Sequence, residues 1–194
     1  NLIIIKSVNR GGVSDNWYIW QLSFNEYVQI FDNNDVLESA TQTGSVTSAN
    51  STTFTLSGTT TSSVNLSGGT YIGYVFSDIL GYSKSGFYRG NGLTNGPFIY
   101  TGFKPALVMI KGADTGGAST DWNVFNSRAD KDSSDGAYEL IINSTKVEST
   151  SNTGIWTYAN GFKVPTDPDL NNSVGPYYAY MAWADVPLKY ARGR

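Results

Sequence analysis

The chain has 194 residues, of which 40% are hydrophobic, so it can bury a core in one large or two small domains. The formal net charge is −3 and no long basic run is present, which argues against nucleic-acid binding through phosphate neutralisation. The sequence has neither Cys nor His, which excludes disulfides, Cys/His zinc sites and Ser-His-Asp triads. No apolar stretch approaches the roughly 20 residues of a membrane-spanning helix, so no membrane insertion is expected.

Alternating apolar and polar residues, rich in β-branched and aromatic types, predict short strands separated by Gly and Asn turns. Helical periodicity is absent from every long window, so we expect little helix. The first half of the chain is predicted to contain the strands Leu2–Val8, Asn16–Leu22, Glu26–Phe31, Thr53–Ser57 and Thr70–Ser77. The second half is predicted to contain Ala106–Gly112, Trp122–Ser127, Tyr138–Ile142, Gly161–Pro165 and Tyr177–Ala184.

The two sets of strands belong to an internal repeat. Leu2–Lys6 returns as Leu107–Lys111, and at the same spacing Trp17 falls on Trp122, which predicts a core position for both indoles. The predicted fold is therefore all-β, with two tandem homologous β-sandwich-like units. The first unit covers residues 1–86, and the second covers residues 87–194, of which 87–105 form a lead-in segment.

The lead-in segment has no counterpart before Asn1. We therefore expect the first unit to be truncated at its N-terminus, with about 20 residues of lead-in upstream in the full gene. Aromatic residues at 87–100 are expected to connect the two units. Thr41–Ser63 is dominated by Ser and Thr, which favours a polar loop with one exposed strand over a glycosylated or adhesive segment.

Trp156 and Tyr158 are the candidate ligand-binding residues. They lie in a polar stretch without a clear equivalent in the first unit, and exposed aromatic rings stack on the apolar faces of sugars. Local packing is the alternative role for both side chains.

Asp130, Asp132 and Asp135 precede a Gly turn and form a candidate calcium site. Their spacing departs from the EF-hand pattern, and Asp-rich turns commonly cap their own backbone, so turn capping is the alternative. Glu38 and Glu148 follow a hydrophobic residue in matching contexts, which indicates a structural role and not a catalytic pair. We therefore do not expect an enzyme.

Several separated blocks form one further pattern. They are Gly90-Asn91-Gly92, Gly96-Pro97-Phe98, Thr101–Lys111, Trp122, Asn160–Val164 and Tyr178–Arg194. In this order the blocks resemble the repeat domain of bacteriophage virion proteins, especially tail-fibre and receptor-binding proteins of marine phages. The resemblance covers nearly the whole chain, and it implies no defined catalytic or binding residue.

The resemblance implies a virion structural protein at the virion surface, forming the C-terminal part of a tail fibre or similar appendage. Such a protein recognises a glycan or protein on the host cell. Two alternatives stay open, a ligand-free capsid-decorating or appendage subunit and a polysaccharide depolymerase domain. Expected partners are other virion subunits, including copies of the same chain in a homo-oligomer such as a trimer.

Overall fold

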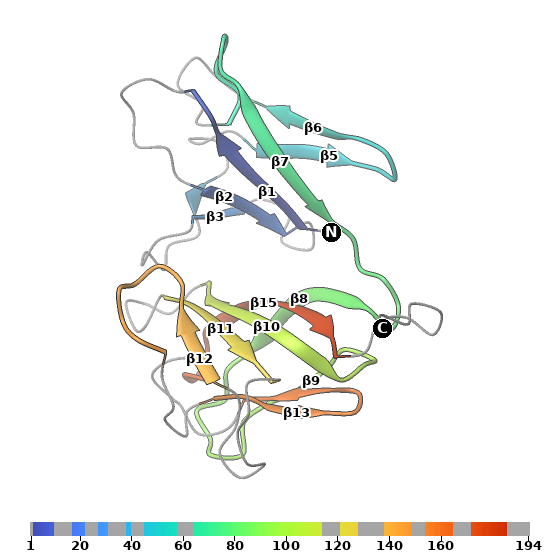
Figure 1. Cartoon of the computed structure of the whole chain (residues 1–194), viewed down its shortest axis with the longest axis vertical. Coiled ribbons are helices and arrows are strands. Elements are labelled where there is room, and N and C mark those ends of the chain that lie inside the picture. Colours follow the sequence, from blue (N-terminus) through green and yellow to red (C-terminus); the bar gives the residue numbers. More distant parts are fainter. Residues whose placement is uncertain are drawn as a thin grey trace. The chain divides into compact units, whose positions relative to one another are not determined.

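A computed structural model of the chain describes residues 2–9, 17–21, 27–30, 38–39, 45–57, 64–113, 121–127, 138–148, 154–164 and 172–185. All regular elements in these ranges are strands, and their pairings are antiparallel (Figure 1). The predicted all-β class is therefore confirmed. No helix long and apolar enough to cross a membrane occurs in the same ranges.

The strands fall into two compact units. The described strands of the first unit are β1 (Leu2–Ser7), β2 (Trp17–Gln21), β3 (Tyr27–Ile30), β4 (Glu38–Ser39), β5 (Ser45–Ala49), β6 (Phe54–Ser57) and β7 (Tyr71–Phe76). Those of the second unit are β8 (Ser83–Arg89), β9 (Phe98–Tyr100), β10 (Pro105–Gly112), β11 (Trp122–Asn126), β12 (Tyr138–Ile141), β13 (Trp156–Tyr158), β14 (Gly161–Lys163) and β15 (Tyr177–Ala184).

All ten predicted strands are present, with ends shifted by a few residues at most. The strands that the sequence did not predict are β4, β5, β8, β9 and β13, and each is short or poor in alternating hydrophobic residues. In the region predicted as a polar loop with one strand, residues 45–57 form a hairpin of β5 and β6.

The larger sheet of each unit contains the same succession of four strands, β3-β2-β1-β7 in the first and β12-β11-β10-β15 in the second. The pairing register also agrees. Leu2 lies opposite Gln21 and Phe76, and Leu107 lies opposite Asn126 and Trp183. The sequence repeat thus corresponds to the same strand pairing, whereas common descent of the two units stays a prediction.

The two larger sheets differ at their edges, since β4 extends the first sheet beyond β3 and β8 extends the second beyond β15. The pairing of β8 with β15 also explains why the units divide between Phe76 and Ser77. The boundary predicted after residue 86 falls inside β8. A strand hydrogen-bonded along its length to β15 belongs to the unit that contains β15.

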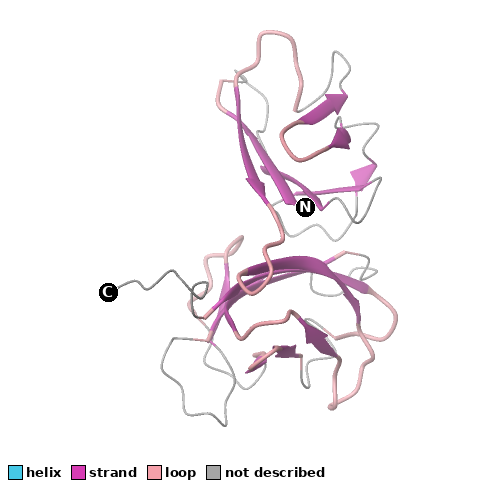
Figure 2. Cartoon of the chain, turned by 90° about the vertical axis from the view of Figure 1, so that its right-hand side faces the viewer, coloured by secondary structure: helices cyan, strands magenta, loops and turns pink. Residues whose placement is uncertain are grey.

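The second unit is a sandwich of its five-stranded sheet and a three-stranded sheet with the order β13-β14-β9 (Figure 2). Ring contacts join the two layers, with Phe162 packing edge-on against Tyr180 at 5.5 Å between ring centroids. Tyr88 of the larger sheet also packs edge-on against Phe162 at 6.5 Å, and within its own sheet it stacks on Tyr178 at 5.2 Å. The buried residues of this core are Tyr88, Ile99, Phe103, Val108, Ile110, Phe125, Ile155, Phe162, Val164, Tyr178, Tyr180 and Ala182.

The core of the first unit lies between its larger sheet and the β5–β6 hairpin. It contains Ile3, Ile5, Tyr18, Trp20 and Val64, with Val46, Phe54, Leu56 and Tyr71 packed against them.

The prediction that both repeat-equivalent indoles are buried is half wrong. Trp122 is fully buried, but the Trp17 side chain is 38% exposed. Trp17 alternates with the core residues Tyr18 and Trp20 and so points to the opposite face of the sheet, where it stacks against Tyr74 with 6.0 Å between ring centroids.

A buried amide holds the lead-in segment of the second unit in place. The Asn172 side chain accepts a hydrogen bond from the Asn91 backbone N–H at 2.8 Å and donates to the Asn91 side chain and the Leu93 carbonyl, both at 3.0 Å. Gly96 lies so close to the Val164 carbonyl that a Cβ there would overlap it. These contacts explain the Gly and Asn residues of the lead-in motif, and they fix the approach to β9.

We predict that Asn172→Ala destabilises the protein by about 1–3 kcal/mol, because the partly buried Asn91 N–H and Leu93 carbonyl lose their partner, the buried Asn172 amide. Urea unfolding measures the free energy. The control is Asn160→Ala, since the Asn160 side chain is exposed. Equal stability of the two variants would show that the Asn172 contacts do not hold the segment.

Ionisation of buried tyrosines is expected to lower the free energy of unfolding at alkaline pH. Burial, with a smaller effect of the nearby Asp78 carboxylate, raises the pKa of Tyr180 to about 12, and burial also raises the pKa of Tyr88. Unfolded tyrosines ionise near pH 10. The buried neutral phenols therefore contribute fully to the free energy of unfolding below about pH 10. This contribution is lost as the pH rises toward about 12.

Unfolding free energies measured from pH 8 to 12 are expected to fall above pH 10, and less steeply in Tyr180→Phe, which cannot ionise at this position. If the variant and the parent lose stability at the same rate, Tyr180 is not a source of the alkaline instability.

Candidate functional site

The three-stranded sheet of the second unit has one buried and one open face. Backbone pairing forms three rows across it, each containing one residue from β13, β14 and β9. The middle row, Thr157, Phe162 and Ile99, faces the core, where Phe162 and Ile99 are buried. Because side chains alternate along a strand, the flanking rows face outward. They consist of Trp156, Lys163 and Phe98, and of Tyr158, Gly161 and Tyr100.

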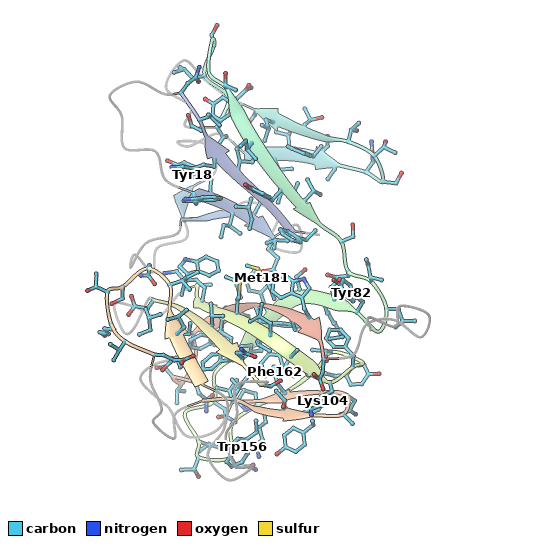
Figure 3. All side chains as sticks on the ribbon, in the orientation of Figure 1. Tyr18, Tyr82, Lys104, Trp156, Phe162 and Met181 are labelled. Atoms are coloured by element: carbon cyan, nitrogen blue, oxygen red, sulfur yellow. The ribbon has the colours of Figure 1, made fainter. Side chains whose placement is uncertain are left out.

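Four aromatic side chains cover the open face. Trp156 is 38% exposed, Tyr158 43%, Phe98 48% and Tyr100 60%. Figure 3 shows Phe162 between the two sheets and Trp156 on the far side of the smaller sheet. Large rings are normally buried, so this concentration on a face of three short strands marks a surface suited to a ligand. We refer to Trp156, Tyr158, Phe98 and Tyr100 as the aromatic face.

Gly161 makes the arrangement of these rings possible. It lies between Tyr158 and Tyr100 in the outward row, where a Cβ would overlap the Ile99 carbonyl oxygen and lie 2.8 Å from the Phe98 ring. In the absence of that atom, Phe98 reaches toward Tyr158 and packs edge-on against it, with 5.8 Å between ring centroids.

Two lysines accompany the rings. The Lys163 ammonium lies 5.8 Å from the centroid of the Trp156 ring and donates a hydrogen bond to the Asn95 side chain. The Lys84 ammonium, from β8, lies 5.4 Å from the centroid of the Tyr100 ring and donates to the Tyr100 carbonyl at 2.9 Å. Each lysine thus has a cation–π contact and one hydrogen bond that hold its charge beside the aromatic face.

This arrangement is suited to binding a sugar. The C–H groups on one face of a pyranose ring pack on aromatic rings, and nearby amides and ammonium groups accept or donate hydrogen bonds to its hydroxyls. Trp156 and Tyr158 supply rings from the same side of β13, and Asn95 supplies an exposed amide. The two outward rows of described residues include no carboxylate.

The structure brings the predicted residues Trp156 and Tyr158 together on one face, while their role in binding stays a prediction. Phe98 and Tyr100 were not predicted as site residues, because their segment was expected to connect the two units. Phe98-Ile99-Tyr100 carries no apolar/polar alternation and is only three residues long, so the sequence offered no clear signal that Ile99 is buried while its neighbours are exposed.

The first unit provides an internal comparison. Its β5–β6 hairpin precedes β7 as β13–β14 precedes β15, and it also packs Val46, Phe54 and Leu56 on a core. On the other side of β5 and β6, however, lie the exposed residues Thr47 and Thr55. The aromatic face is therefore a feature of the second unit and not a general property of this type of hairpin.

The candidate calcium ligands Asp130, Asp132 and Asp135 lie outside the described residues. Within the described ranges, no cluster of three or more Asp, Glu, His or Cys side chains could hold a metal ion. The calcium site stays a prediction from the sequence.

Substitution of Gly161 tests how the aromatic face is built. Gly161→Ala is expected to destabilise the protein by about 1–3 kcal/mol, because β9 must move away from β14 to relieve the overlap. Thermal or urea unfolding measures the loss. Gly73→Ala in β7 is the control, since the nearest atom to its added Cβ lies 3.6 Å away, at ordinary contact distance. If the two variants are equally stable, the close packing at Gly161 does not constrain the sheet.

Comparison with known proteins identifies a family for nearly the whole chain. No curated protein and no solved structure gives a significant match. A family model described as "Domain of unknown function (DUF7483)" matches residues 1–187. The chain therefore belongs to the DUF7483 family.

Proposed function

We propose that this protein is a glycan-recognition part of a bacteriophage appendage of the tail-fibre type, exposed on the virion surface. The observation that carries the glycan specificity is the aromatic face, on which four exposed rings surround Gly161. The virion location is supported by the resemblance of the lead-in motif and the C-terminal strand to phage virion repeats. In this role the protein binds host polysaccharide without cleaving it.

The energetics favour a surface that binds repeating polymers. Rings on three short strands form a shallow platform that contacts a sugar on one side only, so one site gives weak binding. A virion appendage compensates by presenting many copies, because linked sites raise the overall avidity by about 10²–10⁴-fold without new contacts. A homo-oligomeric appendage, a trimer among the possibilities, would combine such sites.

Glycan binding by the full chain tests the proposal. We expect Trp156→Ala to weaken binding to its best ligand on a glycan array by about tenfold or more, because the ring supplies the stacking surface. Tyr82→Ala is the matched control. Tyr82 belongs to the same unit and is 38% exposed, the same fraction as Trp156, but it lies outside the three-stranded sheet.

The control variant should retain parental binding. Equal binding by Trp156→Ala and the parent protein, with both variants folded by circular dichroism, would contradict a role for the aromatic face. Failure of the parent protein to bind any glycan would overturn the proposed function itself.

A further inference from the structure

We infer that the aromatic face selects anionic sugars, namely pyranoses that carry a carboxylate or sulfate group. This inference rests on the proposed function and specifies the class of its ligand. The lysines beside the rings, and the absence of a described acid that neutralises them, are the observations behind it.

Lys163 is central to the charge of the site. It occupies the middle of the outward row between Trp156 and Phe98, so its side chain projects on the same side as the rings. The hydrogen bond to Asn95 and the cation–π contact hold the ammonium over the Trp156 ring. A group bound against the indole would therefore lie close to a fixed positive charge.

Lys84 adds a second charge from another strand. Its ammonium lies near the Tyr100 ring and is tied to the Tyr100 carbonyl. Neither Lys84 nor Lys163 forms an ion pair with a described carboxylate, whereas Lys104 in the same unit lies 3.7 Å from Asp185. Both ammonium groups thus retain the capacity for a charge-assisted hydrogen bond to an anion.

An acidic pyranose would use both the aromatic ring and the charge. When one sugar face stacks on the indole, at the roughly 3.5–4.0 Å of carbon–carbon contact, its substituents project from the ring edge, toward the side chains around the indole. A carboxylate or sulfate at that edge can reach Lys163, whose ammonium lies 5.8 Å from the ring centroid. A neutral sugar would use the same rings but would leave the ammonium without an anionic partner.

Matched ligands test the selectivity. Oligogalacturonates and their fully methyl-esterified forms differ in charge and share the same sugar ring. Sulfated and desulfated galactans form a second pair, which separates carboxylate from sulfate recognition. Titration calorimetry with the full chain in low-salt buffer should give at least tenfold tighter binding for the acidic member of one pair or both. Added salt should reduce this preference.

Substitutions of single lysines test which side chain causes the preference for acidic ligands. Lys163→Gln should reduce binding of the acidic ligand about tenfold with little effect on the neutral one, and Lys163→Arg should retain the preference because it retains the charge. Lys104→Gln is the control, since Lys104 lies outside the aromatic face and faces Asp185. It should bind as the parent protein does.

The outcomes separate the two proposals. If the neutral member of each pair binds as tightly as the acidic one, or if Lys163→Gln weakens both equally, anionic selectivity is overturned while glycan recognition stands. If none of these ligands binds and a broad glycan array is also negative, both proposals fail.

Discussion

The burial of Ile99 and Phe162 is the constraint on which the candidate site depends. These two side chains anchor the three-stranded sheet to the core of the second unit. Since successive side chains of a strand point to opposite faces, this anchoring directs Phe98, Tyr100 and Lys163 away from the core. The hydrophobic effect that stabilises the sandwich thus also determines which residues can meet a ligand. A one-residue shift in register would exchange the two faces and abolish the site.

The two units show how one type of scaffold can present different outward surfaces on its hairpin. Both have a larger sheet with a common succession of strands and a hairpin that covers its core. The inward residues of the hairpins are apolar in each unit, as packing requires. The outward residues are free of that requirement. In the first unit Thr47 and Thr55 occupy these positions, and in the second Trp156 and Tyr158 do.

Local patterns predicted much of the fold. Alternation located most of the long strands, although β8 was not predicted, and the repeat of Leu2–Lys6 as Leu107–Lys111 corresponds to a common pairing register. Short strands such as β9 and β13 were missed because three residues carry too little periodicity to stand out. The burial of Trp17 was mispredicted. An equivalent position in the repeat fixes the direction in which a side chain points, but the residues packed on that face of the sheet decide whether the side chain is buried.

The candidate site was predictable in part. Trp156 and Tyr158 were identified because two aromatic residues in a polar stretch have no obvious place in a core. Phe98 lies far from them in sequence. Although Lys163 follows Tyr158 closely along the chain, only the pairing of β13, β14 and β9 brings all four residues together. The role of Gly161 in packing was not predicted either, since a Gly after Asn is typical of an ordinary turn. Only the structure shows that the Phe98 ring occupies the space that a Cβ of residue 161 would need.

The most direct test of a glycan-binding aromatic face is a nuclear magnetic resonance titration that follows the indole N–H signals of the five tryptophans. An oligosaccharide that binds is added to the full chain, with signals assigned by single substitutions. The account predicts that the Trp156 signal shifts on binding and that the signals of Trp17 and Trp20 in the first unit do not. A saturable shift at Trp17 or Trp20 with none at Trp156 would place binding elsewhere and contradict the account.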